Sequence, residues 1–311
     1  MCRNPAARRI VATVSHPNSE NAEASAIPAD GVEADPLRKA SLAMWASVAA
    51  SWGERADYVD ARGAVVTQAM LDAADLSPGQ SVLELACGPG GVGMAAAEIV
   101  GPDGAVVLSD FAAEMTAIAA RRAKGRRLTN VTTRELDLEQ VNYPDASLDA
   151  VLCRDGLMLV LDPAAAAREA RRVLRPAGRA VFAAWGPRAR NPWLSILFDA
   201  VTAALGMPVP PPGMPGPFSL DAHGTLEALL VSAGFTDVAV REVSAPMHAS
   251  SLDEWWSVIP SLAGPLAQLL ASLPVEAKAA IRTDAEAALA GFATPDGYEL
   301  PGVSIIGVGH R

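Results

Sequence analysis

Residues 82–93 constrain this chain more than any other segment, and they read VLELACGPGGVG. The first four residues are the short apolar run of a buried strand, a glycine-rich turn follows, and residues 94–99 have alanine-rich helical character. Backbone N–H groups point outward where a helix begins after such a turn, so they form a cradle for a small polar ligand. Glycine is required wherever that backbone takes a positive φ or lies close to the ligand. The segment therefore predicts an α/β protein with a ligand site at the turn.

An acidic residue before the turn narrows the class of ligand. Glu84 lies four residues before Gly88, whereas a dinucleotide loop of the G-x-G-x-x-G kind begins with glycine and has no acid there. A carboxylate at this place suits a ligand with an amino group and a positive charge, because opposite charges attract. It does not suit a pyrophosphate. On this motif alone, a glycine turn in an unrelated α/β protein remains the alternative.

Four more motifs follow in order along the chain. About 20 residues beyond the turn, residues 105–110 predict a second strand that ends in Asp110, and a carboxylate at this distance can accept hydrogen bonds from ribose hydroxyls. The other motifs read RELDLE at residues 134–139, ASLDAVLCRD at 146–155 and REARRVLRPAG at 168–178. Their alternation of strand and helix patterns predicts a parallel sheet with helices on both faces.

These motifs, with Glu84-x-x-Cys87-Gly88-Pro89-Gly90 first among them, resemble those of class I S-adenosylmethionine-dependent methyltransferases. The resemblance is to the ubiquinone/menaquinone-biosynthesis type and covers roughly residues 40–245. It implies a Rossmann-like doubly wound α/β sheet, mostly parallel with an antiparallel last strand, plus a helical cap. It also implies S-adenosyl-L-methionine as the cofactor. One departure is Ala86, which stands where the family often has a glycine.

The resemblance assigns cofactor contacts to residues of this sequence. Asp110 would bind the ribose, and Asp137 with the backbone N–H of Leu138 would bind the adenine edge. Aromatic and thioether side chains just after Asp110 would pack on the adenine face. The full set of expected cofactor-binding residues is Glu84, Ala86, Gly88, Gly90, Asp110, Phe111, Met115, Asp137, Leu138 and Cys153.

Composition restricts the partners and the compartment. With 311 residues, of which 50% are hydrophobic, the chain can bury one large core or one core with a cap. The net charge of −10 provides no basic field for nucleic acid or for an anionic membrane. Three cysteines form neither a disulfide framework nor metal-ligand spacing, so we expect a reducing, cytoplasmic environment and no metal. The apolar runs are too short for stable membrane insertion, and no signal peptide is expected.

The pattern along the chain predicts a core with helical additions on both sides. Trp45, Val48, Ala49 and Trp52 recur at helical spacing before the core, and two tryptophans followed by leucines mark a helical region after it. The expected segments are a disordered tail (1–36), an N-terminal helical cap (37–76), the S-adenosylmethionine-binding core (77–186), a helix, proline-rich loop and sixth strand (187–250), a helical substrate cap (251–292) and the last strand (293–311). Methionines of the proline-rich loop are expected to line an apolar pocket.

Few side chains are needed for methyl transfer, because the sulfonium methyl is already activated and positioning supplies much of the acceleration. A base is required only if the acceptor must lose a proton. The catalytic candidates are Asp155, just after the fourth strand, and His248, a few residues after the sixth, with His223 and Tyr298 as weaker ones. The alternatives are that Asp155 binds an acceptor hydroxyl or caps a helix, and that His248 is merely solvated.

The function expected from these observations is S-adenosylmethionine-dependent methyl transfer to a small apolar, phenolic or quinol-like metabolite. A nucleotide-dependent oxidoreductase is one alternative, which Glu84 disfavours. A non-catalytic S-adenosylmethionine-binding protein is another, because this chemistry leaves no obligatory catalytic residue. In the cap, either Trp255 or Trp256 faces the acceptor, or both rings belong to the cap core. We assign no nucleic-acid partner and no oligomeric state.

Overall fold

A seven-stranded sheet forms the centre of the protein in the computed structural model, which describes residues 31–311 and the side chains from residue 36 onward, Pro265 excepted. The strand order is β3-β2-β1-β4-β5-β10-β6. Neighbours from β3 to β5 are parallel, whereas β10 is antiparallel to both β5 and β6. The strands are β1 (Ser81–Glu84), β2 (Ala105–Asp110), β3 (Val131–Glu135), β4 (Leu148–Arg154), β5 (Leu174–Trp185), β6 (Thr236–Ser244) and β10 (Val303–His310). The predicted doubly wound sheet with an antiparallel last strand is confirmed.

Strand residues point alternately to two apolar layers. Val82 of β1 and Val181 of β5 pack with one set of helices, and their neighbours Leu83 and Phe182 pack with the other set. The first set is α3 (Ala64–Ala74), α4 (Gly91–Val100) and α5 (Ala113–Gly125); the second is α6 (Pro163–Val173) and α8 (Thr225–Ser232), with the short helix η1 (Leu157–Leu159) beside them. Burial on both faces explains why β1, β2, β4 and the second half of β5 read as nearly continuous apolar runs, whereas β3 and β6 at the two sides of the sheet are mostly exposed.

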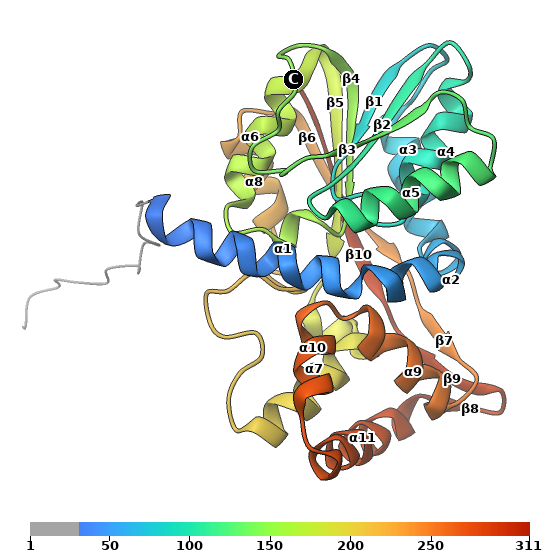
Figure 1. Ribbon diagram of the computed structural model, residues 1–311, viewed down its shortest axis with the longest axis vertical. Coiled ribbons are helices and arrows are strands. Elements are labelled where there is room, and N and C mark those ends of the chain that lie inside the picture. Colours follow the sequence, from blue (N-terminus) through green and yellow to red (C-terminus); the bar gives the residue numbers. More distant parts are fainter. Residues whose placement is uncertain (1–30) are drawn as a thin grey trace, which may run out of the picture.

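The N-terminal helices lie across one edge of this sheet. α1 (Gly31–Glu54) runs between the sheet and a second helical body, and α2 (Ala56–Arg62) continues from it (Figure 1). We expected the tail to extend to residue 36, but α1 already begins at Gly31. The expected boundary rested on the polar, Pro/Ala-rich and patternless sequence up to residue 36, and the helix passes through Pro36. Residues 1–30, for which disorder was expected, lie outside the described part of the chain.

The second helical body has an apolar core of its own. Trp255 is fully buried there, and its indole donates a hydrogen bond to the Trp193 carbonyl at 3.0 Å. Trp256 is half-buried against the same core, and the Arg282 guanidinium lies over its ring. The elements are η2 (Arg188–Arg190), α7 (Pro192–Leu205), α9 (Leu252–Leu262), α10 (Pro265–Ser272), α11 (Val275–Leu289) and η3 (Ala290–Phe292).

One feature of this body differs from expectation. Residues 293–302, assigned to the last strand, instead contribute to a three-stranded antiparallel sheet of β7 (Met247–Ala249), β9 (Gly297–Leu300) and β8 (Ala293–Thr294). Met207 and Met214 of the proline-rich loop are 55% and 39% exposed, and their place in an apolar pocket stays a prediction. Prolines keep their loop out of regular structure and on the surface. Across residues 31–311, no helix combines the length and the apolar character needed to cross a membrane.

Candidate active site

The glycine turn after β1 lies at the carboxyl edge of the sheet, beneath α1. Gly88 and Gly90 have φ values of +50° and +86°, a region that favours glycine. A Cβ on Gly90 would lie 2.9 Å from a methyl group of Leu108. A Cβ on Gly88 would meet only the indole of Trp52, at 3.9 Å. The turn is therefore a cradle that faces α1.

Glu84 holds the helix that follows the turn. It is 2% exposed, and its Oε2 accepts a hydrogen bond from the Gly93 N–H at 2.8 Å. Burial raises the pKa of Glu84 to about 8, although Arg154 and the Gly93 N–H act in the opposite direction. The carboxyl group thus satisfies one free N–H at the start of α4 from inside the protein. A direct contact between Glu84 and a ligand amino group stays a prediction.

Asp110 ends β2 beside the same turn. Its Oδ2 accepts from the Gly88 N–H at 2.8 Å, and its Oδ1 accepts from the Ala112 N–H at 3.0 Å. Burial raises the pKa of Asp110, whereas these backbone donors lower it. Each oxygen has a second lone pair with which to accept a hydroxyl group. A fixed carboxylate next to a glycine cradle fits the ribose and methionine ends of S-adenosylmethionine.

The predicted adenine end is closed by α1. Met115 is buried with Trp52, while Phe111 is half-buried. Leu138 is buried, and Arg38 of α1 lies 3.3 Å from Asp137 Oδ2. Burial raises the pKa of Asp137, and the Arg38 guanidinium lowers it. The ion pair between α1 and the loop after β3 was not predicted from the sequence.

Arg38 also pairs with a second acid of this loop. Glu139 is 6% exposed, contacts the Arg38 guanidinium and accepts from the Asp162 N–H at 2.8 Å. At its other end, the N-terminal segment is held by Asp60, which pairs with Arg122 of α5 at 2.6 Å. Ion pairs therefore hold α1 and α2 to the core on both sides of the glycine turn.

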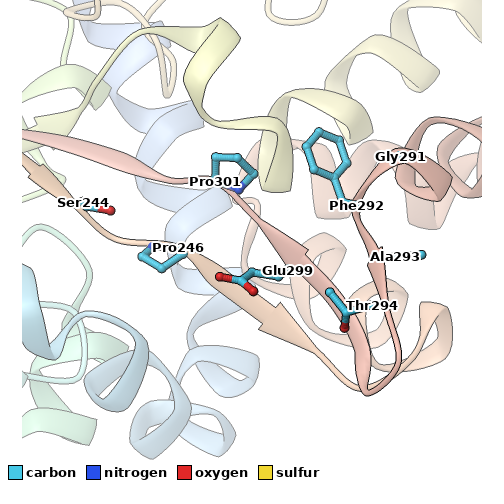
Figure 2. A pocket seen from close by; sticks show the side chains of 8 residues that line it. All are labelled: Ser244, Pro246, Gly291, Phe292, Ala293, Thr294, Glu299 and Pro301. Atoms are coloured by element: carbon cyan, nitrogen blue, oxygen red, sulfur yellow. The ribbon is translucent and has the colours of Figure 1, made fainter.

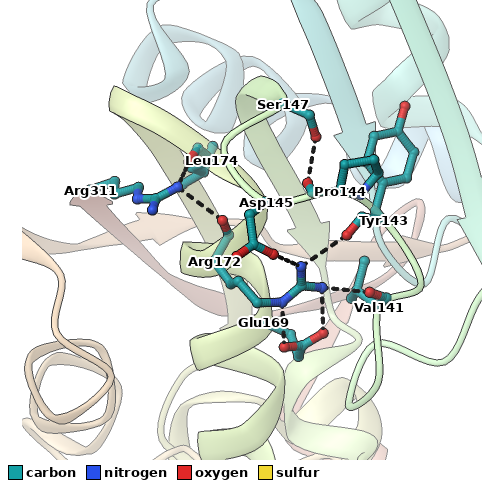
Figure 3. A network of polar contacts seen from close by, with 9 residues as sticks. All are labelled: Val141, Tyr143, Pro144, Asp145, Ser147, Glu169, Arg172, Leu174 and Arg311. Carbon is teal, nitrogen blue, oxygen red and sulfur yellow. Dashed lines mark hydrogen bonds and ion pairs between the residues drawn. The ribbon is translucent and has the colours of Figure 1, made fainter.

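The loop after β3 is held from its far side by Arg172 of α6 (Figure 3). The guanidinium donates to the carbonyls of Val141 and Tyr143 at 2.6 and 2.9 Å. It also pairs with Asp145 and, at 2.8 Å, with Glu169. These contacts give Arg172 of the REARRVLRPAG motif a structural role, because they fix the loop that carries Asp137.

Ala86 and Cys153 lie in close packing between the turn and the end of β4. Ala86 has a φ of +49°, which a side chain rarely adopts, so the replacement of the family's glycine strains the backbone locally. A Cβ on Gly156 would lie 2.4 Å from the Ala86 methyl and 3.0 Å from the Cys153 sulfur. Burial raises the pKa of the Cys153 thiol to about 12. Cys153 is therefore an inert packing thiol, and its cofactor contact stays a prediction.

Asp155 follows β4 at the same edge of the sheet. Its Oδ1 is buried and has no hydrogen-bond partner among residues 31–311. Burial raises its pKa, whereas the guanidiniums of Arg154 and Arg62 and a hydrogen bond from the Trp185 indole lower it. The helix α6 is capped by Asp162, so Asp155 does not cap that helix.

His248 lies elsewhere, on the three-stranded sheet. It is exposed, pairs in register with Glu299 and lines a surface hollow together with Tyr298. A neighbouring hollow on this sheet, lined by Pro246, Phe292 and Glu299 among others, also lacks the cofactor-site residues (Figure 2). His223 is exposed. The structure thus gathers Glu84, Asp110 and Asp155 at one edge and does not bring His248 to them.

Polar side chains of the N-terminal helices were missed by sequence reasoning. In the described part of the chain, buried side-chain atoms without a hydrogen-bond partner occur on Arg38, Trp52, Arg55, Tyr58, Asp60, Arg62 and Asp155. All but Asp155 lie between residues 38 and 62, in the N-terminal helices. Buried polar atoms are nearly always satisfied, so this concentration marks the contact between cap and core as a ligand site. No sequence motif identifies these residues, because their burial comes from packing against distant segments.

Comparisons with known proteins agree with this geometry. Residues 82–178 match the family model of a methyltransferase domain. Nocamycin O-methyltransferase from Saccharothrix syringae is 42% identical over 115 residues, which are 37% of this chain and 41% of that protein. The ubiquinone/menaquinone biosynthesis C-methyltransferase UbiE of Hahella chejuensis is 33% identical over 130 residues, covering 42% and 52%. The chain spans about a third to a half of the length of such curated relatives.

Solved structures show the same fold. YcgJ from Bacillus subtilis superposes with a TM-score of 0.55 at 17% identity, over 79% of this chain and 97% of that one. BH2331 from Bacillus halodurans C-125 gives a TM-score of 0.52 at 18% identity, over 78% and 97%. Residues 82–178 of this chain therefore match a methyltransferase domain and are similar in sequence to UbiE C-methyltransferases, and S-adenosylmethionine is the cofactor of this domain.

Proposed function

We propose that this chain transfers a methyl group from S-adenosylmethionine to a small planar acceptor that carries a hydroxyl group, of phenolic or quinol type. The observation that carries the proposal is the buried, unpartnered Oδ1 of Asp155 at the carboxyl edge of the sheet, beside the Trp185 indole. Two relatives, one named an O-methyltransferase and the other a C-methyltransferase of ubiquinone/menaquinone biosynthesis, support this acceptor class.

The residues of this chain would bind and orient both reactants. The cradle of Gly88 and Gly90, with Asp110 beside it, would hold the cofactor, which supplies a methyl group activated by a sulfonium. Asp137 and Leu138 would hold the adenine. Holding an acceptor in line with the methyl group contributes roughly 7–11 kcal/mol to catalysis in comparable reactions.

Asp155 would act as the base. Its buried carboxylate has a raised pKa, which makes it a stronger proton acceptor than an exposed aspartate. The Trp185 indole would fix one carboxylate oxygen, leaving Oδ1 for the acceptor hydroxyl. Because His248 is exposed on the small sheet, we base the proposal on Asp155. Cys87 and Cys153 are free and buried thiols, which supports a reducing, cytoplasmic setting.

Transfer of a radiolabelled methyl group tests this proposal. Purified protein is incubated with labelled S-adenosylmethionine and a panel of catechols, hydroquinones and naphthoquinols. We expect label in at least one hydroxylated aromatic product, and Asp155→Asn should lower turnover by about 10²–10⁴-fold while binding the cofactor normally. His248→Gln is the matched control and should keep its turnover. Cofactor binding without transfer to any member of the panel would contradict the proposed acceptor class.

A further inference from the structure

Three unpartnered polar atoms at this edge have complementary chemistry. Arg62 Nε is a donor, Tyr58 OH is a donor or acceptor, and Asp155 Oδ1 is an acceptor; each is buried and lacks a partner in the part of the chain that the structure describes. Tyr58 and Arg62 come from α2, whereas Asp155 follows β4. A buried donor or acceptor that stays unsatisfied costs free energy, so such a set is expected to serve a bound group.

Aromatic rings hold the Arg62 guanidinium in place. Its Cζ lies 4.0 Å from the centroid of the Trp193 ring, within the range of a cation–π contact. The Trp193 indole donates to Asn191 Oδ1 at 3.0 Å, and Asn191 is 1% exposed. The position of the Arg62 guanidinium is therefore fixed by contact with the buried Trp193 ring.

The same rings lead back to the carboxylate of the proposed base. Trp193 packs edge-on against Trp185 with a centroid distance of 5.0 Å, and the Trp185 indole donates to Asp155. Aromatic side chains beside the carboxylate suit a planar acceptor, because stacked and edge-on ring contacts are both favourable. The guanidinium and the carboxylate thus belong to one aromatic-walled site.

Hydrogen-bond donors next to Asp155 that lack partners in the described part of the chain favour an acceptor that becomes negative. The charged groups around them are the guanidiniums of Arg62 and Arg154 and the acids Asp155, Glu84, Asp60, Asp110 and Glu254. Burial raises the pKa of Tyr58, while Arg62 lowers it and Glu254 raises it. Within residues 31–311, Arg62 Nε and Tyr58 OH are unpartnered beside the Asp155 carboxylate. A hydroxyl group that ionises next to them would accept a charge-assisted hydrogen bond from the Arg62 guanidinium, whereas a cationic amine would be repelled by it.

We propose that Arg62 and Tyr58 bind the acceptor oxygen opposite Asp155 and select acceptors whose hydroxyl group ionises during the reaction. This inference rests on the proposed function. The acceptor O–H bond breaks, its proton goes to the Asp155 carboxylate, and the electron pair stays on oxygen, where Arg62 and Tyr58 donate hydrogen bonds to it. The electron-rich acceptor then bonds to the methyl carbon while the carbon–sulfur bond breaks, and that electron pair goes to sulfur. Arg62 and Tyr58 are thereby specificity-determining residues.

A chromogenic phenol reports this contact without turnover. The full chain is saturated with S-adenosylhomocysteine and titrated with 4-nitrophenol between pH 5 and 9, and the yellow 4-nitrophenolate is followed by absorbance. We expect the wild type to lower the apparent pKa of the bound phenol. Arg62→Met should weaken phenolate binding about 10- to 100-fold, the effect of a hydrogen bond to a charged group. Arg282→Met, which removes an arginine from the Trp256 ring instead, is the matched control and should bind like the wild type.

Two further measurements separate the possible failures. Binding of labelled S-adenosylmethionine is measured on the same proteins. A wild-type protein that does not bind it would contradict the proposed function itself. Normal cofactor binding together with unchanged phenolate binding by Arg62→Met would overturn only the role of Arg62. If thermal denaturation shows that Arg62→Met is unfolded, Tyr58→Phe replaces it, because this change deletes one hydroxyl and keeps the ring. Wild-type phenolate affinity in a folded Tyr58→Phe protein would likewise overturn the inference.

Discussion

Glu84 is a carboxyl group in a place where its ionised form is unfavourable. Burial raises its pKa from 4.5 to about 8 in the folded protein. Between these two values the folded state binds one more proton than the unfolded state, so the free energy of unfolding falls as the pH rises. A difference of this size corresponds to roughly 5 kcal/mol at most, from 1.36 kcal/mol per pKa unit.

Glu84→Gln should therefore flatten the dependence of stability on pH. The glutamine carbonyl can still accept from the Gly93 N–H, and it has no proton to lose. We expect urea unfolding at pH 5 and pH 8 to show a smaller loss of stability for this variant than for the wild type. Glu227→Gln, at an exposed position of α8, should keep the wild-type slope. Identical slopes for Glu84→Gln and the wild type would mean that Glu84 is ionised in the folded protein.

At the scale of elements, the loop after β3 depends on a contact with α6. Arg172 ties three parts of this loop together, at Val141, Tyr143 and Asp145. Replacing it with methionine removes these hydrogen bonds but keeps an apolar side chain of similar length. Because the loop carries Asp137 and Leu138, we expect Arg172→Met to lower the affinity for S-adenosylmethionine several-fold, as measured by calorimetry.

The control for this change is Arg175→Met. Arg175 is exposed and pairs with Asp149 at 2.6 Å, near the opposite edge of the sheet, so its loss should leave cofactor affinity unchanged. Equal affinities for Arg172→Met and the wild type, with both proteins folded, would show that the loop needs no clamp to bind the cofactor.

Elements whose pattern is local were predictable, and those set by packing were not. The strands β1, β2 and β4 carry apolar runs because both of their faces are buried, and the last strand pairs antiparallel beside β6 as expected. The pairing of β7 with β9 joins residues about 50 positions apart and has no local signal, whereas β8 and β9 form a local hairpin. The start of α1 was also predicted too late, because the polar, Pro/Ala-rich sequence before it shows no apolar helical spacing.

The whole molecule brings together residues that the sequence keeps apart. The acids Glu84, Asp110 and Asp155 could be predicted because each follows a recognisable strand. Tyr58 and Arg62 could not, because they reach the site only when α2 packs beside α4 and Arg62 meets Trp193 of α7, both of which occur later in the chain. Trp255 is fully buried and its indole donates a hydrogen bond to the Trp193 carbonyl, while Trp256 packs on the same core. Both rings therefore belong to the core of the second helical body.

The packing of the N-terminal helices also joins the two bodies of the molecule. Arg55 donates to the Ser257 carbonyl of α9 at 3.0 Å, and a Cβ on Gly264 would lie 3.1 Å from the Trp45 ring. α1 therefore contacts the second helical body on one side and the glycine cradle on the other (Figure 1). This arrangement makes the site a property of the assembled chain rather than of any single segment.

Calorimetric titration with S-adenosylmethionine tests the central claim most directly. We expect one binding site per chain, and Asp110→Asn should weaken binding about 10- to 100-fold because one ribose acceptor is lost. Asp149→Asn is the matched control, since Asp149 also accepts a backbone N–H, from Ser81 at 2.7 Å, but away from the cofactor cradle. Wild-type affinity in Asp149→Asn, with weakened binding in a folded Asp110→Asn, is the predicted result. A folded wild-type protein that binds no S-adenosylmethionine would contradict the account.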